Sequence, residues 1–209
     1  MRLPDPPLLL ITDRKQARQP LADILGAAFA AGCRWASVRE KDLPVADQIA
    51  LARSLLPIAR QFSARLTLHG DAAIAQGAGV DGVHLAAGGC AAATRTMLGS
   101  EALIGLSVHT PAEAASAFAA DYIVAGPAYE TASKPGYGPA LSAAGISAIA
   151  NRSSVPVIAV GGIAANNLSE VMKAGTTGIA VMGGIMRADD PAAEMRGLLA
   201  ALRAQPRPR

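Results

Sequence analysis

Short apolar runs alternate with longer, alanine-rich stretches along almost the whole chain of 209 residues, and this alternation limits the folds open to it. Short apolar runs predict strands, and longer stretches of helical periodicity predict helices. The predicted strands are 8–12, 35–39, 65–69, 82–85, 103–108, 122–125, 155–160 and 178–182. The predicted helices are 20–31, 44–62, 71–78, 90–98, 111–119, 141–151, 165–174 and 191–203.

Regular alternation of strands and helices is typical of a parallel sheet that is covered on both faces. The run 155–160 is apolar almost throughout, as expected for a strand buried on both faces. An open, doubly wound sheet is the competing architecture. Eight evenly spaced strand–helix units favour a sheet that closes into a barrel. We therefore expect an α/β protein that forms a single (β/α)8 TIM barrel over residues 1–204.

Composition argues against membrane and nucleic-acid partners. The apolar run 8–11 is much shorter than the roughly 20 residues of a membrane-spanning helix, and no signal-peptide pattern precedes it. Basic residues outnumber acidic ones by 19 to 16, but three of them, Arg203, Arg207 and Arg209, lie at the end of the chain. We expect a cytoplasmic protein with a disordered tail at 205–209. The alanine-rich helix faces leave a homo-oligomer open.

Two glycine pairs follow the last two predicted strands, Gly161-Gly162 and Gly183-Gly184. Glycine lets backbone N–H groups approach an anion closely, and a helix that follows adds a favourable dipole. In TIM barrels, the loops after strands seven and eight commonly form a phosphate site. Glycine is also common wherever a strand turns into a helix. Two pairs at equivalent positions favour the phosphate site.

The three histidines, His69, His84 and His109, all lie near the ends of predicted strands, at the face where TIM barrels carry their active sites. His109 is the best candidate for moving a proton, because it shares its strand parity with Ser107. His84 is expected to be structural. His69 is a further candidate.

Two more segments offer groups for an anionic ligand. At the end of strand two, Ser37, Arg39 and Lys41 alternate, so they would face one side if the strand persists. A solvated loop, partly neutralised by its acidic neighbours, is an equal alternative. The long loop after strand six carries Thr131, Ser133 and Lys134, and it could bind an anion, act as a lid, or do both.

These motifs occur in an order that resembles the thiamine phosphate synthase/TenI superfamily. The resemblance covers residues 8 to about 187 and implies a barrel that binds a thiazole phosphate on the pathway to thiamine. The motifs that carry it are Leu10-Ile11-Thr12-Asp13, Val38-Arg39-Glu40-Lys41, Gly82-Val83-His84-Leu85, Ser107-Val108-His109, Gly126-Pro127, Val160-Gly161-Gly162-Ile163 and Ile179-Ala180-Val181-Met182.

The synthase branch of this superfamily differs from the chain at positions that matter. The resemblance implies that the synthase binds Mg²⁺ through aspartates, yet the matching positions here are Gly70 and Gly89. A glutamine that the synthase uses on strand two is Ser37 here. Asp71 could replace one lost carboxylate, although a shift of one residue turns its side chain elsewhere.

The loop 129–136 resembles that of TenI-type thiazole tautomerases, with Ser133 in place of the usual cysteine. The resemblance implies that His109 moves the proton. We therefore expect a thiazole tautomerase, an isomerase without cofactor, acting on a small phosphorylated thiazole. Alternatives are the Mg²⁺-dependent synthase, a transferase, and a non-catalytic thiazole-phosphate binder. The expected substrate-binding residues are Arg39, Lys41, Ser107, Thr131, Ser133, Lys134, Gly161, Gly162, Gly183 and Gly184.

Overall fold

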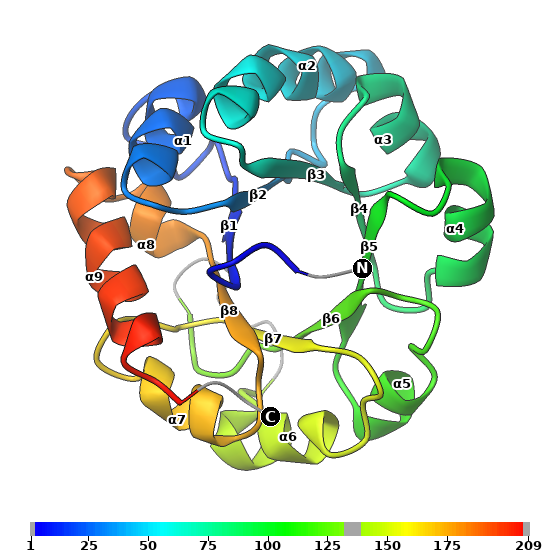
Figure 1. Ribbon diagram of the computed structural model, residues 1–209, viewed down its shortest axis with the longest axis vertical. Helices are drawn as coiled ribbons and strands as arrows, with labels where there is room; N and C mark the ends of the chain where they lie inside the picture. Colours follow the sequence, from blue (N-terminus) through cyan, green and yellow to red (C-terminus); the bar gives the residue numbers. More distant parts are fainter. Residues whose placement is uncertain (1–2, 132–138, 207–209) are drawn as a thin grey trace.

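The computed structural model describes residues 3–131 and 139–206, and these form a closed barrel of eight parallel strands surrounded by helices (Figure 1). Each strand pairs with the next along the chain, and β8 closes the barrel by pairing with β1. The predicted TIM barrel is therefore confirmed. The strands are β1 (Leu8–Ile11), β2 (Trp35–Val38), β3 (Arg65–His69), β4 (Gly82–Leu85), β5 (Leu103–Val108), β6 (Tyr122–Ala125), β7 (Val157–Val160) and β8 (Gly178–Val181).

The helices follow the strands around the outside of the barrel (Figure 1). None of those in the described part of the chain is long and apolar enough to cross a membrane. They are α1 (Leu21–Ala30), α2 (Val45–Gln61), α3 (Ala72–Ala78), α4 (Ala91–Leu98), α5 (Pro111–Ala115), α6 (Ser142–Ala150), α7 (Leu168–Lys173), α8 (Gly183–Met186) and α9 (Pro191–Arg203).

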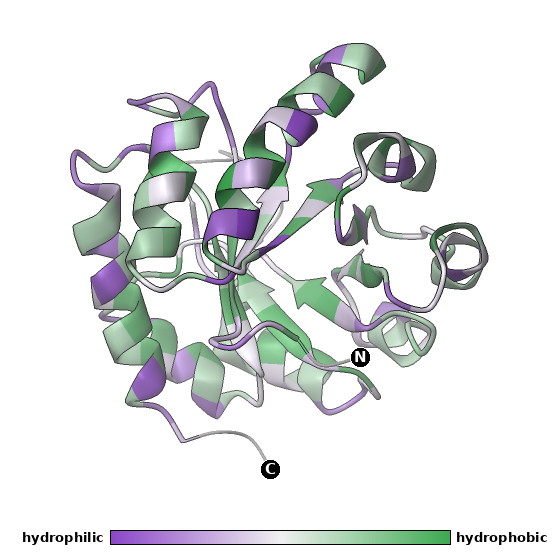
Figure 2. Cartoon of the chain, turned by 45° about the horizontal axis from the view of Figure 1, so that its top comes forward, coloured by the Kyte–Doolittle hydropathy of each residue, from purple (hydrophilic) through white to green (hydrophobic). Residues whose placement is uncertain are grey.

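The hydrophobic core has two parts, because strand side chains alternate between the outside and the inside of the barrel. The larger part fills the space between strands and helices. The smaller one, which we call the interior cluster, fills the barrel itself. Hydrophobic residues accordingly run along the strands, whereas hydrophilic ones are found mainly on the helices and loops (Figure 2). The interior cluster consists of Leu9, Ile11, Trp35, Leu103, Tyr122, Val124, Ile158 and Ala180.

Two predicted helix boundaries differ from the structure by three residues or more, and local side chains explain both. The helix expected at 111–119 ends at Ala115, because Ser116 Oγ donates to Ala112 O and the next amides bond three residues back instead of four. The helix expected at 165–174 begins only at Leu168. Ahead of it, Asn167 holds a turn by accepting from Ala164 N and donating to Gly162 O.

The predicted strands deviate less. Four of the eight are confirmed at both ends, and three others end one residue earlier than expected. The strand expected at 155–160 begins at Val157, since Pro156 has no N–H to donate to the sheet.

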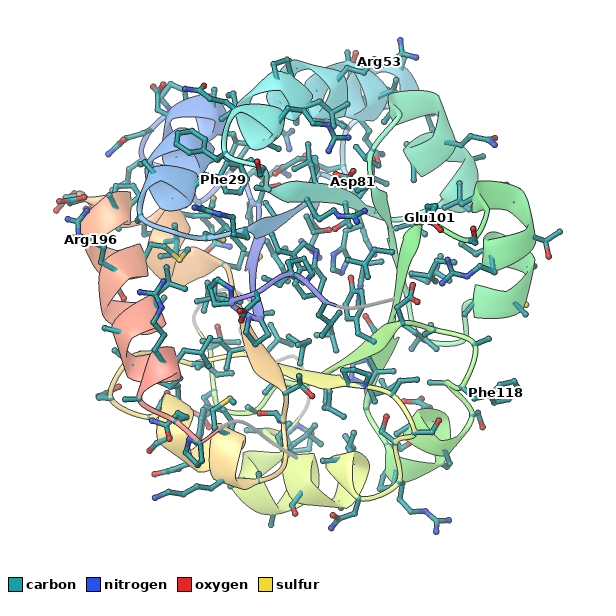
Figure 3. The ribbon with its side chains drawn as sticks, viewed as in Figure 1. Phe29, Arg53, Asp81, Glu101, Phe118 and Arg196 are labelled. Atoms are coloured by element: carbon teal, nitrogen blue, oxygen red, sulfur yellow. The ribbon has the colours of Figure 1, made fainter. Side chains whose placement is uncertain are left out.

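Two aspartates fasten the end of the barrel at which the strands begin. Asp81 accepts from Leu66 N at 2.7 Å and pairs with Arg60 at 2.8 Å. Figure 3 labels Asp81 beside β3 and β4. Asp121 repeats the arrangement two strands further on, with Ile104 N at 2.7 Å and with Arg95. Each aspartate thereby connects the start of its own strand to a preceding one.

Candidate active site

One cavity of about 510 Å³ opens at the carboxyl ends of the strands. It collects residues from β1 to β8, although they are far apart in the sequence. Ser133 and Lys134 lie outside the described residues. Every other residue predicted for the site lines the cavity: Arg39, Lys41, His69, Ser107, His109, Thr131, Gly161, Gly162, Gly183 and Gly184.

The first glycine pair needs to be glycine for conformational and steric reasons. Gly161 and Gly162 have φ angles of 102° and 64°, which side chains other than glycine rarely adopt. A Cβ on Gly162 would lie 2.5 Å from Glu130 O. Asn167 accounts for the turn that follows, since its side chain bonds both Gly162 O and Ala164 N. The loop after β7 is thus fixed against the loop after β6.

The second glycine pair forms the first turn of α8. The first amides of a helix have no partner within it and can donate to an anion. A Cβ on Gly184 would meet nothing within 4 Å, and Gly184 lines the cavity. A methyl group there would therefore occupy space that a ligand needs without disturbing the fold.

We expect Gly184→Ala to weaken binding of inorganic phosphate by about tenfold or more, because hydrogen bonds to charged groups contribute roughly 1.5–3 kcal/mol. Titration calorimetry measures the effect. Gly197→Ala is the matched control, since Gly197 lies on α9 outside the cavity lining and its Cβ would also meet nothing. Equal phosphate affinity in the two variants would contradict the assignment.

Arg39 and Lys41 supply positive charge at the cavity wall next to the end of β2. Burial lowers the pKa of Lys41, and the neighbouring Arg39 adds to this effect. An anion that enters the cavity would relieve the repulsion between the two cations. Ser37, which the alternation placed on the same side, is fully buried and lies 3.4 Å from His69 Nδ1 instead of lining the cavity.

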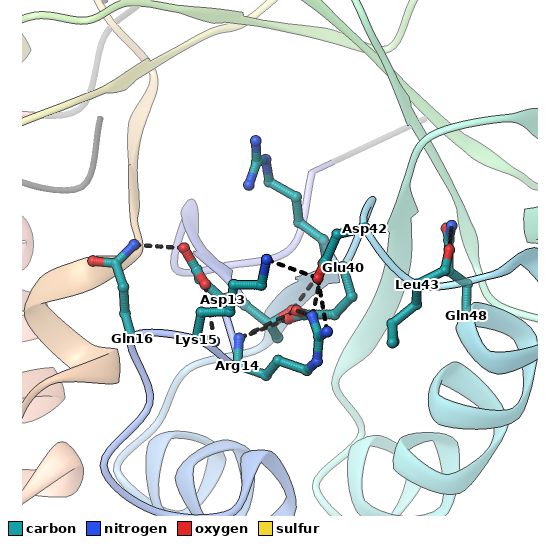
Figure 4. A network of polar contacts seen from close by, with 10 residues as sticks. Asp13, Arg14, Lys15, Gln16, Glu40, Asp42, Leu43 and Gln48 are labelled. Atoms are coloured by element: carbon teal, nitrogen blue, oxygen red, sulfur yellow. Dashed lines mark hydrogen bonds and ion pairs between the residues drawn. The ribbon is translucent and has the colours of Figure 1, made fainter. Parts of the chain in front are cut away.

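A buried carboxylate helps to fix the backbone at Arg39. Glu40 is 3% exposed and accepts from Thr12 Oγ1 at 2.8 Å and from Arg14 N at 3.0 Å. Thr12 Oγ1 in turn accepts from Arg39 N at 2.9 Å. Arg14 also bonds Asp42 through both of its terminal nitrogens, at 2.7 Å each (Figure 4), and this lowers the pKa of Asp42. The loop after β1 therefore fixes the backbone that carries Arg39.

His109 lies just beyond β5 with its ring orientation fixed. Its Nδ1 is 2.9 Å from Gly126 O, and because a carbonyl only accepts, Nδ1 carries a proton. In a neutral ring, Nε2 is then the basic nitrogen. Its backbone N–H bonds Glu113, whose side chain also closes a capping box with Thr110 at the start of α5. Helix α5 thus positions the histidine.

His69 and His84 lie on neighbouring strands with ring centroids 4.2 Å apart. His69 reaches the cavity, whereas His84 is fully buried behind it. Burial lowers the pKa of His84 to about 3, and the charge of Lys41 adds to the shift. His84 is therefore neutral at ordinary pH, which agrees with its expected structural role.

This buried histidine should make stability depend on pH. The unfolded chain protonates His84 near its usual pKa of 6.5, whereas the folded chain protonates it only near 3. Between these values the unfolded state binds more protons, so the free energy of unfolding falls as the pH falls. We expect His84 to account for a loss of about 2 kcal/mol between pH 7 and pH 5. Denaturant unfolding of His84→Gln across that range should show a correspondingly smaller loss. A slope equal to that of the wild type would contradict the expectation.

The cavity also contains groups that were not predicted as site residues. Glu130 and Arg187 line it, and Asn167 fixes the loop that carries the first glycine pair. The place of Glu130 beside Thr131 and of Arg187 shortly after the second glycine pair could have suggested the first two. No comparable signal marks Asn167, because its role depends on how the loop folds.

The residues at the ends of β3 and β4 do not fit a carboxylate-bound Mg²⁺ ion. Gly70 and Gly89 have no side chains to offer, and a Cβ on Gly89 would lie only 2.8 Å from Leu85 Cβ. The carboxylate of Asp71 caps α3 by accepting from Ala73 N at 2.7 Å. Within residues 3–131 and 139–206, no group of three or more His, Cys, Asp or Glu side chains could hold a metal ion.

Comparison with known proteins agrees with this architecture. The chain is 42% identical over 199 residues to a putative thiamine-phosphate synthase of Geobacter sulfurreducens, covering 93% of both chains. It is 34% identical over 197 residues to a thiamine-phosphate synthase of Roseiflexus, covering 92% of this chain and 84% of the relative. The thiamine phosphate pyrophosphorylase of Pyrococcus furiosus superposes with a TM-score of 0.83 at 27% identity, covering 94% of this chain and 95% of the other. Residues 8–185 match the family model TMP-TENI, described as thiamine monophosphate synthase, and the chain therefore belongs to this family.

Proposed function

We propose that this protein is an enzyme of thiamine biosynthesis that binds a thiazole phosphate in the cavity and isomerises a carboxythiazole phosphate to its aromatic tautomer. The proposal rests on the position of His109. This residue lines the same cavity as both glycine pairs, and Gly126 O accepts the proton on its Nδ1. A defined tautomer presents one basic nitrogen, which is what a proton-transfer reaction requires.

The proposed chemistry is a balanced movement of one proton. His109 Nε2 takes a proton from one atom of the substrate, and a proton returns to another atom as the ring becomes aromatic. No electron or group is transferred, so the step needs no co-reactant. The backbone amides of the glycine pairs hold the phosphate, while Arg39 and Lys41 attract the carboxylate. Thr131 lines the same cavity and adds a hydroxyl for the anionic substrate.

The second candidate is thiamine phosphate synthase, a transferase that joins the thiazole phosphate to a pyrimidine diphosphate. The comparisons favour this candidate, because both relatives compared above carry the synthase name. The site favours the isomerase, because the positions of the implied Mg²⁺ ligands are Gly70 and Gly89. Both candidates use the same phosphate end of the cavity, so this end does not distinguish them.

A paired assay of the purified protein separates the candidates. We expect isomerisation of the carboxythiazole phosphate at the same rate with Mg²⁺ and with a chelator. Formation of thiamine phosphate from the two precursors, dependent on Mg²⁺ and without isomerisation, would establish the transferase and overturn the proposal. Binding of thiazole phosphate with neither activity would instead identify a non-catalytic binder, and it would also overturn the proposal.

A further inference from the structure

Three neighbouring strands place a histidine, a glycine and a tyrosine in one row across the barrel. His84 of β4 is paired with Gly105 of β5, and Gly105 is paired with Tyr122 of β6. Because Gly105 has no side chain, the imidazole and the phenol meet over it, with His84 Nδ1 3.2 Å from the Tyr122 hydroxyl. A Cβ on Gly105 would overlap the phenol and lie 2.5 Å from His84 Nδ1.

The row continues into the cavity through Ser107. This residue lies two positions beyond Gly105 on β5, so it faces the same side of the strand. His84 Nε2 is 2.9 Å from Ser107 Oγ, and Ser107 lines the cavity. His84 and Tyr122 are both fully buried. A hydrogen-bonded chain therefore leads from the interior cluster to the substrate space.

The direction in which the hydrogen bonds from Tyr122 through His84 to Ser107 run follows from counting donors and acceptors. If His84 carried its proton on Nδ1, it would donate to Tyr122, and the buried phenol proton would have no acceptor among the described residues. A buried, unsatisfied hydroxyl is costly. If the proton is on Nε2, Tyr122 donates to Nδ1 and His84 donates to Ser107, so that the phenol and both ring nitrogens of His84 have partners. The proton of Ser107 is then left to point into the cavity.

We propose that Tyr122 and His84 are positioning residues that hold Ser107 as a hydrogen-bond donor to an anionic group of the substrate. We expect the group that accepts from Ser107 to be a carboxylate or phosphate oxygen, because the cations Arg39 and Lys41 line the same cavity. The proposal rests on the proposed function only in placing the substrate there. The direction of the hydrogen bonds is a property of the protein without ligand.

The surroundings keep both buried groups in the required protonation states. Burial lowers the pKa of His84 and raises that of Tyr122, so the imidazole is neutral and the phenol protonated at ordinary pH. His69 packs against one face of His84, and the ring of Trp35 meets Tyr122 edge-on with centroids 4.7 Å apart. These contacts fix both rings from the side.

The first test is the nitrogen NMR spectrum of the ligand-free protein. With only three histidines in the chain, His84→Gln assigns the resonances. We expect Nε2 of His84 to be protonated, Nδ1 to be unprotonated, and neither to titrate between pH 5 and pH 8. Tyr122→Phe should shift both resonances, whereas Tyr129→Phe, which removes a hydroxyl bonded to Glu170, should leave them in place. A proton on Nδ1 would overturn the proposal.

The second test is a double-mutant cycle on the affinity for thiazole phosphate. We expect Ser107→Ala to weaken binding by about tenfold to a hundredfold, and Tyr122→Phe to weaken it less. In the Ser107→Ala background, Tyr122→Phe should have no further effect, since it acts through the serine. Additive losses would show a merely structural role and overturn the proposal. Failure of the wild type to bind would contradict the proposed function, and the NMR spectrum would still decide the direction of the chain.

Discussion

Replacing His109 with alanine is expected to slow the isomerisation of carboxythiazole phosphate by about 10²- to 10⁴-fold, the usual contribution of a general acid or base. The loss should appear in kcat, because the histidine acts on the reacting proton, whereas the glycine pairs and the cations bind the substrate. Steady-state kinetics of the two proteins measures it.

The matched measurement is affinity for inorganic phosphate, which His109→Ala should leave unchanged if the variant is correctly folded. If the phosphate affinity is preserved, the lower rate is due to the loss of the imidazole. Equal turnover in the variant and the wild type would show that another group moves the proton, and His69 would be the next residue to change, since it also lines the cavity.

The largest effect on stability is expected for Gly105→Ala. The added methyl group would occupy the space shared by Tyr122 and His84, and neither ring can move away because both are completely buried. Overpacking of this kind costs typically 1–3 kcal/mol and occasionally more, and here a buried hydrogen bond is lost as well. We expect a loss of about 4 kcal/mol, or a melting temperature lower by about 10 °C.

Thermal unfolding of Gly105→Ala and Gly197→Ala side by side measures this effect. Both variants add one methyl group at a glycine, but Gly197 is exposed on α9, where alanine is the better helix former. We expect the control to be at least as stable as the wild type. A loss below about 1 kcal/mol in Gly105→Ala would mean that the barrel interior adapts more easily than its packing indicates.

The barrel could be predicted because its signals are local. Short apolar runs and alanine-rich stretches each act over a few residues, and together they imply the order of the strands. The two helix boundaries that differ most also have local causes. They depend on Ser116 and Asn167 bonding back to the main chain, which residue type alone does not reveal.

The site could be predicted only in part. Residues at strand ends reach the cavity because all parallel strands end at the same face, so Arg39, His109 and the glycine pairs were accessible to sequence reasoning. The pairing of His84 with Tyr122 was not, since it depends on the register of three strands. The tail at 205–209, the cytoplasmic location, the absence of a nucleic-acid partner and a homo-oligomer stay predictions.

The two aspartates just before β4 and β6 stabilise one end of this barrel, and the cavity lies at the other end. Asp81 and Asp121 fasten strands at the end opposite the cavity, and neither lines it. Side chains that line the cavity can therefore be exchanged without disturbing these two aspartate contacts. A barrel fastened in this way suits directed evolution in which cavity side chains are varied, while the first glycine pair and the opposite end of the barrel are left unchanged.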